Sequence, residues 1–392
     1  MLGAEPGTHN TLAQVLKGAV ASSISLGLIF GSVLAEAVPV ESGPESFDVR
    51  VLAPIRSVDS HDRALYTYEL VVTNFSTGSL TVTSLVIADP QTGQIVANYA
   101  AAELSQRFTR VGDSHANSAE PELTPGRSAI IYVELEVPKT APINSLRQTF
   151  TYGNAGSVRA LTLPVVAVSK QSPAVLAPPM KAGRWVAVHA PDWERGHRRA
   201  IYALAGVARI PGRYAIDFLG VDHEGHTTKG MQDRAADAVG YDEPVFAGGD
   251  GTVAAVRNDV SESVLIHDNG RHPLADAAGN YVCLKLGDGV FVFYEHLRPA
   301  SSHLHVGQRI HVGEVIGRVG FSGDSTGPHL HMHVADGPDP LSSNGLPFVL
   351  SHYVELGRYD KIDDLGTKPW SLWPRPRSIL REWPYYDVVI HF

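Results

Sequence analysis

The sequence predicts a mainly β protein in which a β-sandwich precedes a second β-rich domain. Short alternating runs separated by turn residues fill residues 47–168, which is typical of sandwich strands. A Pro-rich stretch then interrupts the chain at residues 169–183, and strand-like, histidine-bearing segments continue from residue 184 to residue 350. With 392 residues, the chain is long enough for each domain to bury its own core.

Residues 1–37 have the pattern of an export signal or N-terminal anchor. Lys17 precedes an uncharged run over residues 18–34, and the sequence Ala-Glu-Ala that ends at residue 37 supplies a small-x-small cleavage site. The run is long for a signal core, so an uncleaved membrane anchor remains open. We expect an exported protein, in a bacterial periplasm or cell envelope, with no further membrane span.

The first domain is expected to be of immunoglobulin-like type. The segments LYTYELVVTN and LTVTSLVIAD alternate and are separated by the turn FSTGS, and RSAIIYVELEV, LRQTFTYG and RALTLPVVAV continue the series. This region has no His/Asp/Glu cluster that suggests catalysis, so we expect it to position or contact other parts. At the other end of the chain, residues 351–392 combine Pro breaks with aromatics, which predicts a packing extension.

Composition excludes several classes of function. The formal charge is -9 and no Lys/Arg block is present, which argues against nucleic-acid binding. Eighteen histidines stand against one cysteine, Cys283, so an internal disulfide and a thiolate zinc cage are both excluded. Within GNYVCLKLG, Cys283 has the pattern of a small buried strand residue.

The run PHLHMHV predicts a metal site on a strand. Because successive side chains of a strand point to opposite faces, His329, His331 and His333 share one face, while Leu330 and Met332 take the other. Neutral imidazole is the commonest metal ligand in proteins. The alternative is a His-rich strand face that is merely solvated.

Further motifs stand upstream in a fixed order: RYAIDF with Asp217, then PVFAGGDGTV, then YEHL with His296, then VGQRIHVGEVIGRVG and GDSTGPHLH. In this order they resemble the lysostaphin-type (LytM-like) zinc metallopeptidases, which cut peptide cross-links in bacterial cell walls and have the duplicated hybrid motif fold. The resemblance covers about residues 199–334. It implies one zinc ion with Asp217 and His331 among its ligands, and His296 and His329 as catalytic residues.

One position departs from this pattern. The family has a histidine four residues before the aspartate, and here that position is Arg213, which is always protonated and cannot bind a metal. If Leu204, Ala205 and Gly206 form a three-residue hairpin loop, counting outward places His197 opposite Arg213. We therefore favour His197 as the replacement ligand, although a one-residue slip in register would turn it away.

Other histidines compete for that role. His223 and His226 stand in a loop after Asp217, and His189 lies further upstream. The second HLH sequence, His303 to His305, is expected to be a solvated loop. The default for Glu295, Asp324 and His333 is also solvent exposure, although each stands where it could contact a metal-binding imidazole.

These observations predict an exported zinc metalloendopeptidase that hydrolyses peptide bonds, with peptidoglycan cross-links as the expected substrate. Arg213 supports an alternative, a metal-free LytM-like module that binds and activates other cell-wall enzymes through an envelope partner. A third possibility is a peptidase that acts on proteins, since no wall-binding repeat is recognisable. The retention of Asp217, His296, His329 and His331 favours the enzyme.

Overall fold

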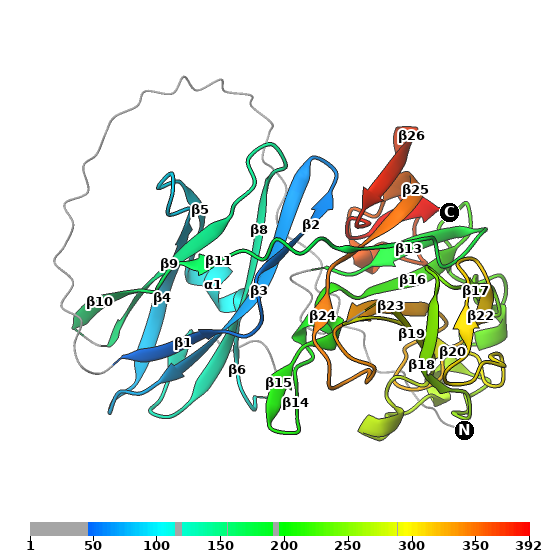
Figure 1. Ribbon diagram of the computed structural model, residues 1–392, viewed down its shortest axis with the longest axis horizontal. Helices are drawn as coiled ribbons and strands as arrows, with labels where there is room; N and C mark the ends of the chain where they lie inside the picture. The colour runs from blue at the N-terminus through cyan, green and yellow to red at the C-terminus, as the bar shows by residue number, and fades with distance from the viewer. Residues whose placement is uncertain (1–45, 114–119, 155, 191–195, 288) are drawn as a thin grey trace, which may run out of the picture. The chain divides into compact units, whose positions relative to one another are not determined.

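The structure is mainly β, with 50% of it in strands and 8% in helices (Figure 1). The expected export segment, residues 1–37, lies outside the described residues. Among the residues that are described, no helix has both the length and the apolar character needed to cross a membrane. The structure, a computed structural model, describes residues 46–113, 120–154, 156–190, 196–287 and 289–392.

Two antiparallel sheets form the N-terminal region, which we call the sandwich (residues 47–167). In one sheet the order is β1-β3-β8-β6, and β2 also pairs with β3. Its strands are β1 (Phe47–Val51), β2 (Arg56–Ser60), β3 (Arg63–Asn74), β6 (Phe108–Arg110) and β8 (Ser128–Pro138).

The other sheet has the order β10-β9-β4-β5, with β7 paired to β4 and β11 paired to β9. A single short helix, α1 (Ala101–Arg107), lies between β5 and β6. The strands are β4 (Leu80–Ala88), β5 (Ile95–Ala100), β7 (Glu122–Leu123), β9 (Ser145–Asn154), β10 (Ser157–Thr162) and β11 (Val166–Ala167).

Alternating apolar residues of both sheets meet in one core, as the sequence pattern predicts. Leu70 and Val72 of β3 contribute to the same cluster as Leu85 of β4 and Phe150 of β9. Each of these four side chains is completely buried. The expected β-sandwich is therefore present; its immunoglobulin-like type stays a prediction.

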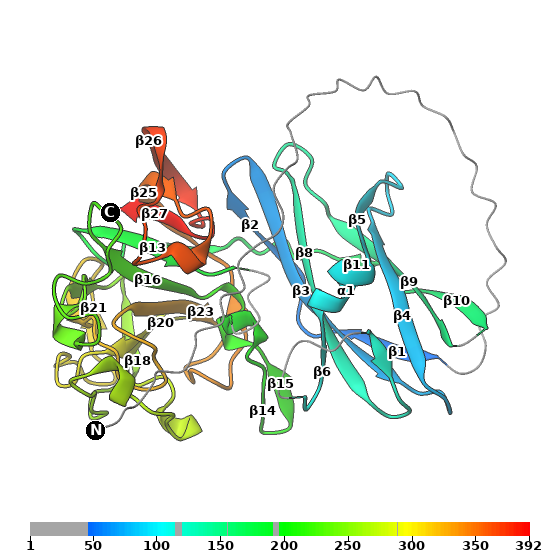
Figure 2. The ribbon, with the colours of Figure 1, turned by 180° about the vertical axis from the view of Figure 1, so that it is seen from behind.

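A twelve-stranded sheet organises the rest of the chain, which we call the C-terminal domain (residues 174–391). Its main path is β12-β25-β27-β13-β16-β23-β20-β19-β18-β21, with β24 paired to β23 and β26 paired to β25 (Figure 2). The strands are β12 (Ala174–Leu176), β13 (Arg184–Val188), β16 (Ile216–Val221), β18 (Gly251–Arg257), β19 (Asn280–Gly287), β20 (Val290–Leu297), β21 (Arg309–Ile310), β23 (Leu330–Ala335), β24 (Gly345–Leu346), β25 (Phe348–Arg358), β26 (Ser371–Glu382) and β27 (Val388–His391).

Two small two-stranded sheets and several single-turn 3-10 helices complete this domain. The small sheets pair β14 (Tyr202–Leu204) with β15 (Val207–Arg209), and β17 (Pro244–Phe246) with β22 (Val315–Arg318). The 3-10 helices are η1 (His197–Arg199), η2 (Pro211–Tyr214), η3 (Ala235–Asp237), η4 (Ile266–Asp268), η5 (Leu274–Asp276) and η6 (Ile362–Asp364).

The C-terminal residues are part of the large sheet rather than an addition to its surface. Strand β25 runs through Leu350, where the sequence pattern suggested that the domain ends. Strand β27 pairs with β25 on one side and with β13 on the other, and Val388 and Ile390 belong to the main core cluster. Burial alternates along much of β25, so this strand has one face in the core and the other partly open to water, as is usual in antiparallel sheets.

Candidate metal centre

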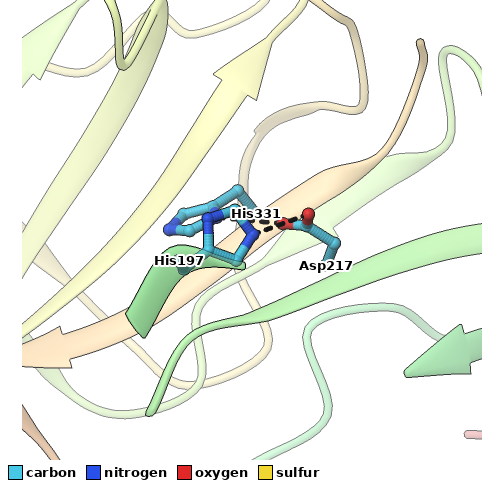
Figure 3. A group of neighbouring side chains, drawn as sticks. All are labelled: His197, Asp217 and His331. Atoms are coloured by element: carbon cyan, nitrogen blue, oxygen red, sulfur yellow. Dashed lines mark hydrogen bonds and ion pairs between the residues drawn. The ribbon is translucent and has the colours of Figure 1, made fainter. Parts of the chain in front are cut away.

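Asp217 and His331 face each other across neighbouring strands. Antiparallel pairing of β16 with β23 sets Asp217 directly opposite His331, and directly opposed residues project from the same face. The flanking side chains Phe218 and Met332 point the other way, into the main core. His331 Nδ1 lies 2.9 Å from Asp217 Oδ1 (Figure 3). Burial of the apolar neighbours therefore fixes the direction of both polar side chains.

His197 reaches the same carboxylate from outside the sheet. Its Nε2 lies 2.7 Å from Asp217 Oδ2, and its ring centroid is 4.4 Å from that of His331 (Figure 3). The hairpin expected to deliver it is wrong by one residue, because Leu204 pairs with Val207 around a two-residue loop. His197 instead belongs to the 3-10 turn η1, so its proximity does not come from cross-strand pairing.

A glycine makes room for this turn. Helix η1 packs against η2, and a Cβ added at Gly212 would lie 2.6 Å from the Cβ of His197 and 3.0 Å from its carbonyl oxygen. Real Cβ atoms do not approach other atoms so closely, so any larger residue at position 212 must displace His197. Gly212 is therefore needed for the imidazole of His197 to lie where it does.

These three side chains offer a donor set that fits zinc. The donor atoms of His197, Asp217 and His331 all lie within 4.8 Å of one another, which lets one ion contact all three. Burial raises the pKa of Asp217, but the neighbouring imidazoles of His197 and His329 outweigh it and hold that pKa well below its ordinary value. Burial and the nearby His197 lower the pKa of His331 to about 4. Metal binding needs an ionised carboxylate and neutral imidazoles, and these shifts favour both.

Two further histidines lie beside this donor set, each oriented by a backbone carbonyl. His296 Nδ1 is 2.8 Å from the carbonyl oxygen of Ser322, and His329 Nδ1 is 2.8 Å from that of Gly327. In each ring the proton on Nδ1 is donated to the carbonyl, which leaves Nε2 directed elsewhere. His329 Nε2 lies 3.3 Å from Asp217 Oδ1, an ion-pair distance without hydrogen-bond geometry. The two ring centroids are 4.9 Å apart.

Their environments move the two pKa values in opposite directions. Burial, followed by the neighbouring His329 and His331, lowers the pKa of His296 well below its ordinary value. Burial also lowers the pKa of His329, but the Asp217 carboxylate outweighs it and raises that pKa. One imidazole is therefore neutral near pH 7 while its neighbour is disposed to carry a proton, a combination found at acid–base sites.

A β-bulge turns two consecutive residues of β20 toward the site. The register between β19 and β20 shifts between Asn280 and Val282, and His296 has φ = 59°, in the left-handed region that only few non-glycine residues adopt. As a result Glu295 and His296 are both buried. Simple alternation allows only one of them to face the site.

The expectation that Glu295 and His333 are solvated is wrong. His333 Nδ1 lies 3.1 Å from His331 Nε2, and Glu295 oxygens lie 3.9 Å from His331 Nε2 and 3.7 Å from His333 Nδ1. Phe293 stacks on His333 with the ring planes 9° apart. Burial and the nearby Asp217 raise the pKa of Glu295 well above its ordinary value. These groups surround the far side of the His331 ring and restrict its orientation. Asp324, by contrast, is exposed, as expected.

The competing histidines do not reach Asp217. His223 and His226 are exposed in the turn after β16, where His226 Nδ1 lies 3.1 Å from Asp222 Oδ2. His189 is buried, but its Nε2 faces the carbonyl oxygen of Pro384 at 2.9 Å. The loop with His303 and His305 is exposed, as predicted. Of these upstream and loop histidines, only His197 contacts the Asp217 carboxylate in the part of the chain that the structure describes.

Arg213 points away from the donor set and into the sandwich. It is buried, its Nε donates to Glu69 Oε2 at 2.8 Å, and its Nη1 donates to the carbonyl oxygen of Gly345 at 3.3 Å. It belongs to η2, and β16 begins three residues later, at Ile216. Cys283 is a buried strand residue, as expected, and burial raises the pKa of its thiol.

Two of the three donor residues, His197 and His331, line a cavity of about 130 Å³ in the C-terminal domain. His296, Glu295 and His331 line it together with Tyr202. A larger cavity of about 360 Å³ borders the site only through His197 and lies between the sandwich and the C-terminal domain. The polar groups of the site converge on the smaller cavity.

Part of the C-terminal domain matches a known protein family. The model of peptidase family M23 matches residues 231–343, a stretch that includes His296, His329 and His331 but neither Asp217 nor His197. The chain contains a LytM-type peptidase M23 domain. The match thus agrees with the family that the motif order indicates.

Part of this chain is also similar to a curated protein. Peptidoglycan DD-endopeptidase ShyA of Vibrio cholerae is 36% identical over 88 residues, a match that spans 22% of this chain and 16% of that protein.

Among solved structures, the catalytic domain of lysostaphin from Staphylococcus simulans is 19% identical, with 42% of this chain and 88% of that domain covered and a TM-score of 0.22. A zinc-containing peptidase from Vibrio cholerae is 14% identical, covers 71% of this chain and 80% of that one, and has a TM-score of 0.23.

Proposed function

We propose that the protein is an exported zinc metalloendopeptidase that hydrolyses peptide bonds of peptidoglycan. The observation that carries the proposal is the convergence of His197, Asp217 and His331 within 4.8 Å of one another, beside two further oriented histidines in an M23 domain. An imidazole pair with one carboxylate is a zinc donor set that leaves room for substrate. The peptidoglycan substrate is proposed by analogy with the endopeptidase relative.

His197, Asp217 and His331 would hold the ion, with one imidazole from η1 and the other two ligands from β16 and β23. A zinc ion in such a set acts as a Lewis acid and activates water for amide hydrolysis at neutral pH. The network of Glu295 and His333 keeps the His331 ring in place by occupying the space at its Nε2.

His296 and His329 would carry the proton chemistry. Because Nδ1 of His296 is held by Ser322, its neutral ring presents the lone pair of Nε2 and can accept a proton from the attacking water. His329 is disposed to carry a proton on Nε2 next to Asp217, and can donate a hydrogen bond to the oxyanion or a proton to the leaving amine. Neither ring needs to move, since both are buried and anchored.

A metal-free regulatory module is the second candidate, and Arg213 is the observation that favours it. Loss of a ligand at that position would suit a domain that binds a wall enzyme rather than cuts a peptide. However, His197 lies where a replacement ligand is needed, at 2.7 Å from Asp217. We therefore place the regulatory role second.

The deciding experiment measures zinc and cleavage together. Zinc content of the purified protein is determined by elemental analysis, and purified peptidoglycan is digested and its products identified by mass spectrometry. We expect about one zinc per chain and new peptide ends with the wild type, and neither with Asp217→Ala. Asp222→Ala is the matched control because its carboxylate follows the same strand but lies in an exposed turn.

The outcomes separate the candidates. Absence of zinc in the wild type after reconstitution overturns the metallopeptidase and leaves the regulatory module. Zinc that is retained in Asp217→Ala shows that the ion is held elsewhere. Zinc binding with no cleavage of peptidoglycan, but with cleavage of a denatured protein, points instead to a peptidase that acts on proteins.

A further inference from the structure

The three residues of η1 divide their contacts between the metal centre and the sandwich. His197 turns to Asp217, while Arg198 and Arg199 turn the other way. Arg199 lies over the ring of Tyr132 of β8, with its Cζ 4.1 Å from the ring centroid. A single turn therefore has its imidazole in one domain's site and both guanidinium groups on the other domain.

Arg198 is the tighter of the two attachments. It is 6% exposed, and its Nε donates to Glu69 Oε1 at 2.9 Å. Its Nη2 donates to the carbonyl oxygens of Tyr68 at 2.8 Å and of Val133 at 2.7 Å, and its Nη1 contacts Glu134. These partners belong to β3 and β8 of the sandwich, so four hydrogen bonds hold the residue next to His197 against a rigid sheet.

Glu69 connects this anchor to the departure from the family pattern. It is completely buried and accepts from Arg198 with one oxygen and from Arg213 with the other, at 2.9 and 2.8 Å. The two arginines stand on η1 and η2, which pack on each other through Gly212. Burial raises the pKa of Glu69, but the two guanidinium charges outweigh it and lower that pKa. The sandwich thus holds both turns through one carboxylate.

The positions of the other two proposed ligands do not depend on the sandwich. Asp217 and His331 are fixed by strand pairing and by the burial of their neighbours within the C-terminal domain. His197 lies on a single turn, and a single turn of 3-10 helix has little stability of its own. Its position must therefore come from the contacts of its neighbours.

We propose that the sandwich is a working part of the metal centre, in which Arg198, anchored by Glu69 and Glu134, positions His197 to bind the ion. The inference rests on the proposed function, because it requires that His197 is a ligand. Arg198 is a positioning residue: it contacts neither the donor atoms nor the cavity of the site. The chain thereby replaces the ligand lost at position 213 with one whose placement depends on the other domain.

The substitution Arg198→Met in the full chain tests this proposal, and it leaves each neighbouring carboxylate with one arginine partner. Glu69 keeps Arg213 at 2.8 Å and Glu134 keeps Arg107 at 2.9 Å, so neither carboxylate is left buried without a cation. We expect zinc affinity, measured by competition with a chromogenic chelator, to weaken about 10- to 100-fold. Arg198→Lys, which restores one positive charge, should recover part of the affinity.

A matched control breaks a different ion pair between the same two domains. Lys139 Nζ lies 2.6 Å from Glu382 Oε1, and neither residue belongs to η1, η2 or the donor set. Lys139→Gln should leave zinc affinity unchanged. If Lys139→Gln weakens zinc binding as much as Arg198→Met, the effect comes from general loosening between the domains and the proposal is overturned.

A double-mutant cycle separates positioning from stability. His197→Ala removes the imidazole through which Arg198 acts, so adding Arg198→Met to it should weaken zinc binding no further. Additive losses would contradict the proposal, as would wild-type zinc affinity in a folded Arg198→Met protein. Circular dichroism and thermal unfolding report whether each variant is folded. If Arg198→Met does not fold, Glu134→Gln removes the negative charge that Arg198 contacts and should give a smaller loss of zinc affinity. Unchanged zinc affinity in Glu134→Gln would then overturn the proposal.

The result for Asp217→Ala keeps this proposal distinct from the proposed function. Unchanged zinc affinity in that variant means that the ion is held elsewhere and that the proposed function fails. Loss of zinc in Asp217→Ala together with normal affinity in Arg198→Met means that the metal site is correct and that only the role of the sandwich is wrong.

Discussion

A carboxylate contacts histidine at two places on or next to β16, and the two clusters differ in burial. Inside the strand, Asp217 is 8% exposed and contacts two imidazoles at 2.7 and 2.9 Å. Just beyond its end, Asp222 contacts His226 at 3.1 Å in a turn where that side chain is 49% exposed. Both groups offer carboxylate and imidazole donors that could meet an ion. Only in the first group are a carboxylate and an imidazole held by strand pairing and kept from water.

This difference shows that residue type alone does not make a metal centre. A buried carboxylate must be compensated, so the positions of its partners are restricted and its donor atoms are preorganised. An exposed carboxylate is stabilised by water, and its partners gain little by staying in one place. The variants below test how far the contrast between the two clusters extends.

The largest effect is expected from the buried cluster itself. His331→Ala removes a donor that strand pairing fixes, and we expect more than about 100-fold weaker zinc binding together with loss of hydrolysis. Zinc affinity and release of peptidoglycan fragments are the measurements. Retention of both would mean that burial does not identify the ligands.

His329→Ala and His296→Ala divide binding from turnover within the buried group. Each is expected to keep zinc and to lower turnover by about 10²- to 10⁴-fold, because these rings act on protons rather than on the ion. Steady-state kinetics on a soluble wall peptide and zinc analysis of the same samples test this. Loss of zinc in either variant would reassign that ring as a ligand.

Glu295→Gln tests the groups behind His331. The amide keeps the size of the side chain but replaces the carboxyl group next to two imidazoles with a group that cannot ionise, and a 10- to 100-fold loss of zinc affinity or activity is expected, about that of other groups that orient ligands. Asp324→Asn is the control for zinc affinity, since Asp324 is exposed although it lines the same cavity. Equal effects of the two substitutions would be inconsistent with an orienting role.

Buried and exposed imidazoles should differ in their effect on the stability of the protein in acid. Burial lowers the pKa of His189 from 6.5 to about 4, so between these pH values the unfolded chain binds more protons than the native one. Its contribution to the free energy of unfolding, at most ~3 kcal/mol, is complete above pH 6.5 and is lost as the pH falls through 4. His189→Gln should therefore flatten the fall in stability over this window, measured by urea unfolding. His303→Gln, in an exposed loop, should follow the wild type.

The smallest effect is expected from the exposed cluster. His226→Ala should change neither zinc content nor turnover, since its side chain contacts Asp222 and Glu224 rather than Asp217 and is largely in water. A loss of zinc in this variant would show that the turn after β16 contributes to the centre after all.

Much of the architecture could be predicted because strand alternation is local. The pattern of PHLHMHV fixes which side chains share a face, and burial of Leu330 and Met332 then directs His329, His331 and His333 together. The sandwich strands follow for the same reason. The prediction that His333 is exposed was wrong, because alternation shows on which face of the strand a side chain lies but not which residues cover that face.

His197 marks the limit of such reasoning. It was expected from a cross-strand count, yet that register is shifted by one residue and the histidine lies in a 3-10 turn. No local pattern could place it, because its position depends on Gly212 and on Glu69, a residue more than a hundred positions away along the chain.

By itself, then, the sequence determined the mainly β class, the faces of the strands and the order of motifs that marks the M23 domain, since all of these depend on neighbouring residues. Only the tertiary structure decided that a bulge turns both Glu295 and His296 inward, and that Arg198 and Arg213 bind one buried carboxylate of the sandwich. Such contacts arise from the need to compensate buried charge, and that need appears only when distant strands have come together.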